Sequence, residues 1–339
     1  MRHLSARNTL TVVLGLAVAM VASYFAVKDI NFDKLGTALA GAQYIYVIPG
    51  LIVVYAGYAA RAWRWQLMIA PLKPVPFRRV FPLLVIGFAW NVLIPLRVGE
   101  LVRAHLLGRR EGVSRPALLA TVFVERVLDG VCIVALLALL GFLYPALPAW
   151  VEDFSRIALL LFGVALAGLL MLVISEPFTL RLLLRVTSFL PHALATRINT
   201  FALAFMQGYI ALRSPWRLLW IMLATALGWL IEIGSYAILF PAFGLNLPLP
   251  AFISATSFYA VVLNLATLVP SPPGFVATIE GFGVAALGVF HIDAESALSL
   301  TVVGHAIQLF AIITLALWAL WHERLTPSQV AEGASDTER

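Results

Sequence analysis

The sequence predicts an all-α polytopic membrane protein with about six full spans and two oppositely oriented re-entrant hairpins. Two observations predict the class: 62% of the 339 residues are hydrophobic, and only 12% are charged. A soluble domain has roughly 25% charged residues, so this chain has too few polar side chains to cover a water-facing surface. The third observation is a set of long runs without Asp, Glu, Lys or Arg, at residues 8–27, 35–60, 130–151, 157–175, 233–279 and 296–322. Most of these runs reach the roughly 20 residues that cross a bilayer.

The first run follows Arg2, His3 and Arg7, as the apolar core of a signal peptide would. Its charge-free length exceeds the ~7–15 residues of that core. We therefore predict a first span over 9–27. Lysine and arginine are enriched on the cytoplasmic side of membrane proteins, which places the N-terminus in the cytoplasm.

The next elements alternate between the two sides of the membrane. The apolar run 80–96 has basic residues on both flanks, so both of its ends belong on the cytoplasmic side. It predicts a first re-entrant hairpin, broken at Pro95 and Gly99. A serine followed by a proline, Ser114 and Pro116, indicates a helix start. The predicted full spans after the first are 44–62, 114–143, 157–175, 217–240 and 296–320.

A second re-entrant hairpin is predicted over 250–290, which has no basic flank and contains Pro270 and Gly274. It would enter from the outside. The basic, amphipathic segment 176–217 would lie along the cytoplasmic surface. The chain then divides into a membrane domain, 1–322, and a polar tail, 323–339, that we expect to be disordered.

This topology assigns 19 of the 23 basic residues to the cytoplasmic side. It predicts a multi-pass protein of the inner (cell) membrane with both termini in the cytoplasm. The net charge of +6 fits this bias and contact with anionic lipid, not nucleic acid.

The two predicted hairpins share a pattern of residues. Each has a Pro-x3-Gly break, with an asparagine before it and a glutamate after it, although the offsets of these residues differ. The residues are Asn91, Pro95, Gly99 and Glu100 in the first hairpin, and Asn264, Pro270, Gly274 and Glu280 in the second. Opposite directions of insertion make this an inverted-topology repeat, whose interrupted helices form a binding site near the midplane. The alternative is that these prolines and glycines only kink ordinary spanning helices.

Several charged residues fall at membrane depth, where ionisable groups are costly and are either functional or paired. Six of them, with zero net charge, are Arg97, Glu100, Arg103, Glu125, Arg126 and Asp129. They could form a neutral structural network that joins the first hairpin to its neighbour, or they could bind a ligand. Glu232 and Glu280 have no basic neighbour in sequence, so each could be protonated, paired with a buried arginine or part of a relay.

Two further groups have simpler interpretations. His305 and Gln308 are expected to be interhelical hydrogen-bond partners, because one histidine does not make a metal site. We therefore expect no metal and no cofactor. Arg61 and Arg64, beside tryptophans at the inner end of the second span, are first a membrane-surface anchor and secondarily a contact for headgroups.

The motif Asn91-x3-Pro95-x-Arg97-x-Gly99-Glu100-x2-Arg103, followed by Glu125-Arg126-x2-Asp129 and by Pro270-x3-Gly274 with Glu280-Gly281, resembles the flippase-like family. That family is named after the transmembrane region of lysylphosphatidylglycerol synthase. The resemblance extends to about residue 322. It implies two facing re-entrant hairpins and translocation of lipid headgroups. The sequence departs from the family's glycine-rich stretch at 272–276. Full synthases add a soluble domain that aminoacylates phosphatidylglycerol, which we do not expect here, so lysyl transfer is not expected.

The leading hypothesis is a lipid translocase or carrier that moves a phosphate-bearing headgroup between leaflets, and that is not an enzyme. Its headgroup site would comprise Asn91, Arg97, Glu100, Arg103, Asn264 and Gly274. Its coupling network would comprise Glu125, Arg126, Asp129, Glu232 and Glu280. One alternative is a non-transporting subunit that recruits a glycosyltransferase or lipid-modifying enzyme through 176–217. Another is an integral-membrane lipid transferase.

Overall fold

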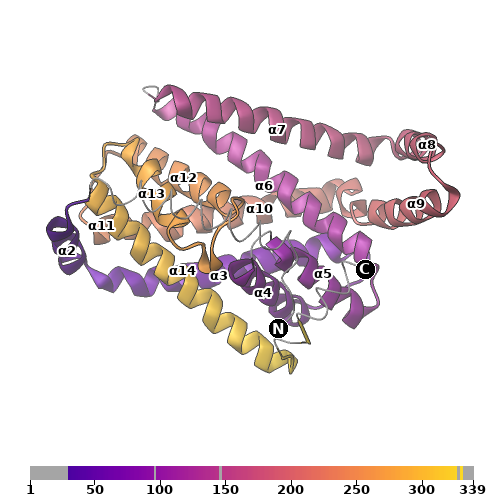
Figure 1. Cartoon of the computed structure of the whole chain (residues 1–339), viewed down its shortest axis with the longest axis horizontal. Helices are drawn as coiled ribbons and strands as arrows, with labels where there is room; N and C mark the ends of the chain where they lie inside the picture. Colours follow the sequence, from indigo (N-terminus) through magenta and orange to yellow (C-terminus); the bar gives the residue numbers. More distant parts are fainter. Residues whose placement is uncertain (1–29, 95–96, 145–146, 327–328, 331–339) are drawn as a thin grey trace.

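The computed structural model describes residues 30–94, 97–144, 147–326 and 329–330. The predicted first span, 9–27, lies outside these residues. The described chain consists of helices and their connections, with no strand among them. The predicted all-α class is therefore confirmed (Figure 1).

Among the described residues, six helical stretches are long and apolar enough to cross a membrane. They contain α3 (Val47–Ile69), α6 (Arg115–Leu143), α7 (Ala149–Ile174), α10 (Pro215–Ala237) with α11 (Leu239–Ala242), α12 (Leu249–Ala266) and α14 (Ala294–Glu323). All but α12 correspond to predicted spans. Helix α12 falls instead in the predicted second hairpin, and its 18 residues are near the lower limit for a crossing.

The first hairpin consists of α4 (Phe77–Leu93) and α5 (Val98–Glu111), which pack side by side. Two glycines bring the backbones together: a Cβ at Gly99 would lie 1.8 Å from the carbonyl oxygen of Gly87. Arg97 precedes α5 in the left-handed conformation, with φ of 54°. A non-glycine residue there is strained by roughly 1 kcal/mol or more, so surrounding contacts must hold the turn in place.

The second hairpin consists of α12, the short helix η4 (Pro273–Phe275) and α13 (Thr278–Gly288). Its returning helix begins at Thr278, four residues after Gly274 of the predicted break. The reason is the backbone: Gly274, Phe275 and Ala277 all have positive φ, so a regular helix cannot begin among them.

The two hairpins match when positions are counted from the helix ends. Asn91 and Asn264 are each the third residue from the end of the first helix, α4 or α12. Glu100 and Glu280 are each the third residue of the returning helix, and a residue with positive φ caps both of those helices. The offsets differ in sequence only because the second linker is longer. Helix α4 also contacts η4, so the two hairpins meet.

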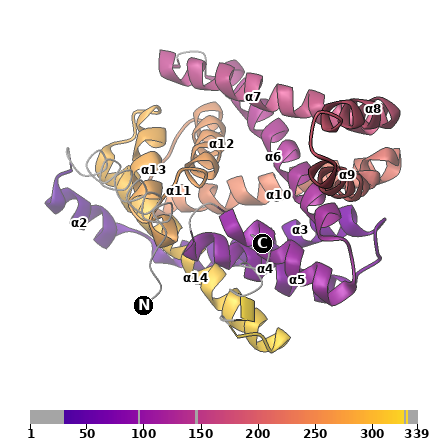
Figure 2. The same ribbon diagram turned by 45° about the vertical axis from the view of Figure 1, so that its right-hand side comes forward.

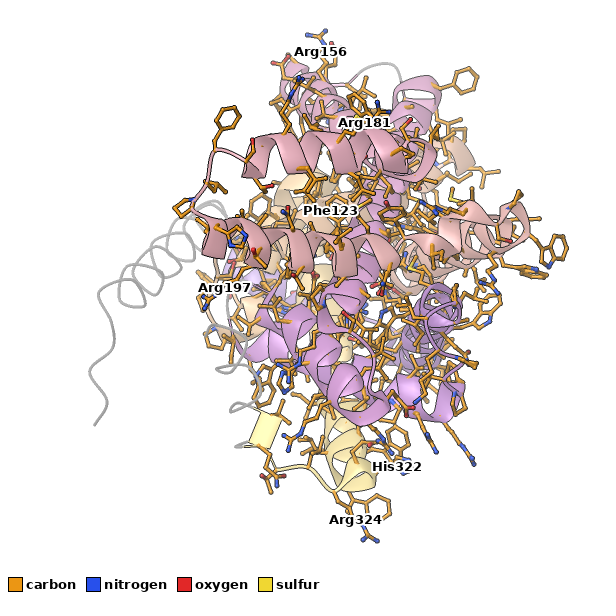
Figure 3. All side chains as sticks on the ribbon, turned by 90° about the vertical axis from the view of Figure 1, so that its right-hand side faces the viewer. Phe123, Arg156, Arg181, Arg197, His322 and Arg324 are labelled. Carbon is orange, nitrogen blue, oxygen red and sulfur yellow. The ribbon has the colours of Figure 1, made fainter. Side chains whose placement is uncertain are left out.

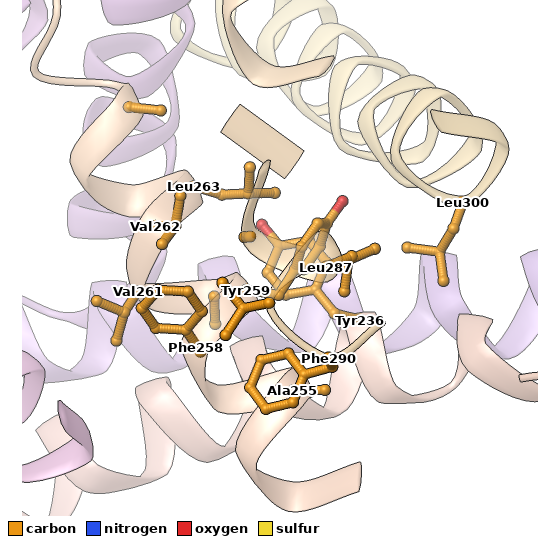
Figure 4. Close-up of a cluster of buried hydrophobic side chains, with 14 of the residues drawn as sticks. Tyr236, Ala255, Phe258, Tyr259, Val261, Val262, Leu263, Leu287, Phe290 and Leu300 are labelled. Atoms are coloured by element: carbon orange, nitrogen blue, oxygen red, sulfur yellow. The ribbon is translucent and has the colours of Figure 1, made fainter. Parts of the chain in front are cut away.

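The largest hydrophobic cluster packs the second hairpin against α14 and α10. Figure 4 shows Tyr236, Tyr259, Phe290 and Leu300 in this cluster. The rings of Tyr236 and Tyr259 meet edge to face at 5.0 Å. A separate cluster joins α3, α4 and α5 around Trp65. Both hairpins therefore have well-packed apolar sides.

The remaining helices lie at the periphery. Helix α7 runs along one edge of the molecule and exposes many leucines. It leads into α8 (Glu176–Thr187) and α9 (His192–Gln207), which with η3 (Ile210–Arg213) form the segment predicted to lie along a membrane surface. Figure 2 shows α8 and α9 next to each other. Helix α2 (Phe32–Gly41) and η1 (Tyr44–Tyr46) precede α3 in the chain. Figure 3 places Arg156 of α7 and Arg324, just beyond α14, at opposite edges of the molecule.

Candidate functional site

A cavity of about 200 Å³ lies where the two hairpins meet α3, α6, α10 and α14. Both hairpins contribute to its wall at the ends of their helices. Its polar lining residues are Tyr58, Arg61, Arg64, Asn91, Arg97, Glu100, Arg126, Asp129, Thr225, Glu232, Ser235, Tyr236, Asn264, Thr267, His305 and Gln308. The structure thus brings together at this cavity Asn91, Arg97, Glu100, Arg126, Asp129, Glu232 and Asn264, all of which the sequence predicts as site residues.

Four arginines line the cavity, and two of them come from α3. Arg61 and Arg64 are three residues apart, so they lie on one face of the helix. Arg61 pairs with Glu232 of α10. The other carboxylate oxygen of Glu232 accepts a hydrogen bond from the side-chain amide of Asn264. Of the three states considered for Glu232, the structure therefore shows pairing with an arginine.

The second α3 arginine belongs to a continuous chain of ion pairs. Arg64 Nη1 lies 2.6 Å from Asp129 Oδ1 of α6, and the other oxygen of Asp129 lies 3.3 Å from Arg126 Nη1. Arg126 Nε lies 3.4 Å from Glu100 Oε1 of the first hairpin. The predicted network between this hairpin and α6 is therefore present, and it forms one wall of the cavity.

Arg97 connects the tips of the two hairpins. Its Nη1 lies 3.4 Å from Glu100 Oε1, and its Nη2 donates a hydrogen bond of 2.5 Å to Thr267 Oγ1, at the end of α12. Thr267 in turn donates to the carbonyl oxygen of Asn264. Since Arg97 is the strained residue at the turn, these contacts fix both its backbone and its guanidinium at the cavity wall.

Arg103, which the sequence assigns to the headgroup site, is not among the residues that line the cavity. Its side chain is only 2% exposed and pairs with Glu125, which is 1% exposed. The guanidinium also lies 4.8 Å from the ring centre of Trp65. It borders only a narrow crevice with no room for water. The reason is helical geometry, because this position faces α3 and α6. Arg103 and Glu125 therefore form a buried ion pair behind the residues that line the cavity.

His305 of α14 pairs with Glu280 of α13, in the second hairpin. His305 Nδ1 lies 2.7 Å from Glu280 Oε1, which confirms the expected interhelical hydrogen bond for His305. His305 and Gln308 line the cavity, whereas Glu280 lies behind His305. Gly274 is also outside the lining, although the next residue, Phe275, contributes to it.

Sequence reasoning underestimated Arg61 and Arg64 because it ended the second span near residue 62. Helix α3 continues to Ile69, so both arginines lie within it. A signal was available in the sequence: Gly57, Arg61 and Arg64 have the spacing of residues on one helical face. A stripe of glycine and arginine on an otherwise apolar helix indicates a polar surface that faces protein.

The chemistry of this site is that of fixed charges and hydrogen bonds. Four guanidiniums face the cavity, and each can bind a phosphate through two parallel hydrogen bonds. Among the described residues, no group of three or more His, Cys, Asp or Glu side chains is arranged to hold a metal ion. The residues present fit an anionic ligand that exchanges for a carboxylate.

The comparisons with known proteins agree with this architecture. Residues 12–316 match the family model described as the lysylphosphatidylglycerol synthase TM region. The chain is 25% identical over 319 residues to a UPF0104 membrane protein of Methanothermobacter thermautotrophicus, covering 90% of this chain and 93% of that protein. It is 27% identical over 159 residues to a UPF0104 membrane protein of Methanocaldococcus jannaschii, covering 43% of this chain and 47% of that protein. The chain therefore belongs to the family of the lysylphosphatidylglycerol synthase transmembrane region.

Proposed function

We propose that this protein moves a phosphate-bearing lipid headgroup between the leaflets of the membrane, through the cavity between its two hairpins. The lipid tails would stay in the bilayer. The observation that carries this proposal is the lining of four paired arginines at the meeting point of two matched hairpins. The proposal involves no covalent step.

The size of the cavity supports a headgroup as its occupant. Pockets that enclose a drug-sized ligand span about 300–1,000 Å³, and this cavity has about 200 Å³. A phosphate with a small substituent fits this space, whereas two acyl or prenyl chains do not. Exposed apolar side chains at the hairpin tips, Leu93 and Leu268, suit contact with the tails.

The matched hairpins support movement as well as binding. In transporters built from inverted repeats, one repeat rocks against the other around a fixed site at the repeat interface. We propose that the first hairpin opens toward the cytoplasm and the second toward the outside of the inner membrane, with both termini cytoplasmic. A phosphate that replaced Thr267 as the partner of Arg97 would break the direct contact between the two tips and allow them to separate.

The test is headgroup movement in reconstituted vesicles of phosphatidylcholine and phosphatidylglycerol, with a trace of one fluorescent lipid. Dithionite added outside destroys only the outer-leaflet fluorescence, so the slow phase reports movement from the inner leaflet. Fluorescent phosphatidylglycerol, phosphatidylethanolamine and a polyprenyl phosphate are compared in parallel. Faster movement of at least one of them than in protein-free vesicles is expected.

Arg97→Gln is the variant that tests the site. A charge-assisted hydrogen bond contributes about 1.5–3 kcal/mol, which corresponds to a roughly 10- to 100-fold slower movement. The matched control is Arg156→Gln, since Arg156 is 73% exposed, lies on α7 and pairs only with acids on its own helix among the described residues. Absence of movement with every phosphate-bearing lipid, or equal rates for wild type and Arg97→Gln, would refute the proposal. The first of these results would favour a membrane subunit that recruits a lipid-modifying enzyme.

A further inference from the structure

His305 differs in kind from the other charged and chargeable residues around the cavity. The four arginines stay charged at any physiological pH, and carboxylates titrate several units below neutrality. An imidazole changes its charge between about pH 5 and 8. Among the described residues that line the cavity, His305 is the only histidine. Its side chain is therefore the one described lining group of a type that can gain or lose a proton in this range.

The partner of His305 is a carboxylate, which can form an ion pair with an imidazolium. Glu280 is the third residue of α13, and the first turn of a helix stabilises a negative charge. With Glu280 ionised, His305 Nδ1–H donates to Oε1 across 2.7 Å, which leaves Nε2 as the proton acceptor. Protonation of Nε2 then converts a neutral ring beside a carboxylate into an imidazolium–carboxylate pair. The side chains of His305 and Glu280 are 9% and 15% exposed, so the pair is largely buried but still partly accessible.

The other groups around this pair do not neutralise Glu280. From α12, the phenol of Tyr259 is near Glu280 and donates to Thr301. From α3 and α10, Tyr58, Tyr236 and the ion pair Arg61–Glu232 share the cavity with His305, as do Arg64, Arg97, Glu100, Arg126 and Asp129 across it. Helix α4 contributes Phe88, Asn91 and Val92 to the lining, none of them titratable. No arginine of the described structure pairs with Glu280, so its charge is balanced only when His305 is protonated.

The matched position in the first hairpin shows what is unusual here. Glu100 is also the third residue of its returning helix, and it pairs with Arg97 and Arg126, which are permanently charged. Glu280 has a titratable partner in the same place. One hairpin therefore holds its carboxylate with a fixed charge, and the other holds it with a charge that depends on proton supply.

The packing of α13 on α14 makes this pair sensitive to movement of the second hairpin. A Cβ at Gly283 would lie 2.5 Å from Thr301 Oγ1, so the two helices touch one turn away from the pair. A small tilt of α13 about this contact would change the distance between Glu280 and His305. Because an imidazolium holds a carboxylate more strongly than a neutral ring does, proton binding at His305 resists such a tilt.

We propose that His305 and Glu280 form a proton-exchange site that couples proton binding to the position of the second hairpin. The inference rests on the proposed headgroup movement in one respect: it supplies an energy source for that movement. With the proton bound, α13 is held against α14. When the proton leaves, the second hairpin is released and the cavity opens on its side.

The first experiment reports hairpin position without any lipid substrate. Cys132 is the only cysteine of the chain, so a Cys132→Ala background allows one bimane fluorophore to be attached at Leu268→Cys, an exposed position at the tip of the second hairpin. Labelling is done at one pH, and the emission is then followed from pH 8.5 to 5. A sigmoidal change with a midpoint in the imidazole range is expected.

Three variants test whether the emission change depends on the His305–Glu280 pair. His305→Gln keeps a hydrogen-bonding side chain but cannot take up a proton, and the emission change should be lost. Glu280→Gln keeps the shape and removes the charge that favours the imidazolium, so the midpoint should move to lower pH. The control His322→Gln should behave as wild type, because His322 is exposed at the end of α14 (Figure 3) and stacks on Trp318. If His305→Gln fails to fold, as judged by size-exclusion chromatography, Glu280→Gln decides the matter.

The outcome separates the proton site from the proposed function. A wild type without a pH response, or a response that persists in a folded His305→Gln, would overturn the proton site whatever the lipid assay shows. If no fluorescent lipid moves while the bimane response depends on His305, the headgroup proposal fails and the proton site stands. If lipids move, an inward proton gradient across the vesicles should accelerate or slow their movement in wild type and have no effect in His305→Gln.

Discussion

The contact between Gly87 and Gly99 allows a quantitative test of how the first hairpin is built. The added methyl of Gly99→Ala would lie 1.8 Å from the carbonyl oxygen of Gly87 and 2.7 Å from Asn91 Oδ1. Carbon and oxygen ordinarily approach to about 3.3–3.6 Å, so α4 and α5 must separate by about 1.5 Å. Rotation of a side chain cannot relieve the closest contact, because the carbonyl oxygen of Gly87 belongs to the backbone of α4.

The energetic cost follows from this displacement. Overpacking a well-packed interior costs about 1–3 kcal/mol, and exchanging glycine for alanine within a helix recovers up to about 1 kcal/mol. We expect Gly99→Ala to be destabilised by about 2 kcal/mol. The next residue, Glu100, moves with the backbone, which would disturb its 3.4 Å contact with Arg126. Headgroup movement should therefore slow as well.

The assay is reversible unfolding in mixed micelles of dodecyl maltoside and increasing SDS, followed by the fluorescence of the nine tryptophans. The control is Gly141→Ala, since no atom lies within 4 Å of a Cβ at this α6 position. Gly141→Ala should be as stable as wild type or more stable by up to about 1 kcal/mol. If Gly99→Ala unfolds at the wild-type SDS fraction and moves lipid at the wild-type rate, the close contact between the hairpin arms is refuted.

Two further predictions use the same unfolding assay. Arg103→Met removes the closest partner of the buried Glu125 and should destabilise by about 3–5 kcal/mol, whereas the double variant with Glu125→Leu should regain most of the loss. Outside the predicted spans, a hydrogen bond from the Lys73 ammonium lowers the pKa of Glu111 below the ordinary glutamate value of 4.5. This contact stabilises the fold above pH 4.5, and the stabilisation is lost as the pH falls through the lowered folded value. Glu111→Gln should remove that part of the acid sensitivity, and an unchanged acid limb would contradict it.

Much of the fold could be predicted from the sequence, because charge spacing reports membrane spans directly. Apolar runs identified all but one of the spanning-length helices in the described chain, and Gly99 and Gly274 lie at or beside the turns of two helix pairs. The returning helix of the second pair begins at Thr278, four residues after Gly274, since a single glycine in the sequence does not reveal that Phe275 and Ala277 also take positive φ. Backbone strain of this kind depends on surrounding contacts and leaves no mark in composition.

The pairing of the charges was only partly predictable. Residues on one hairpin and the next helix, such as Glu100 and Arg126, are close enough in sequence for a network to be expected. Arg61 and Glu232 are 171 residues apart, and nothing local connects them. The sequence left three states open for Glu232, and only the packing of α3 against α10 selects among them. Arg103 shows the opposite error, because its charge suggested a ligand while its helical face turned it toward Glu125.

The pairing of all four cavity arginines bears on how a carrier can both bind and release its cargo. In the structure, Arg61, Arg64, Arg97 and Arg126 each have an acidic partner. Under the proposed function, a phosphate that binds here would replace a carboxylate that is already present, so the gain in free energy would be the difference between two similar ion pairs. Unpaired arginines in a shielded cavity would hold a phosphate far more tightly and release it slowly. Passage through a membrane requires a site that is favourable to occupy and easy to leave. A cavity of exchangeable ion pairs meets both requirements, whereas the same arginines without their carboxylates would meet only the first.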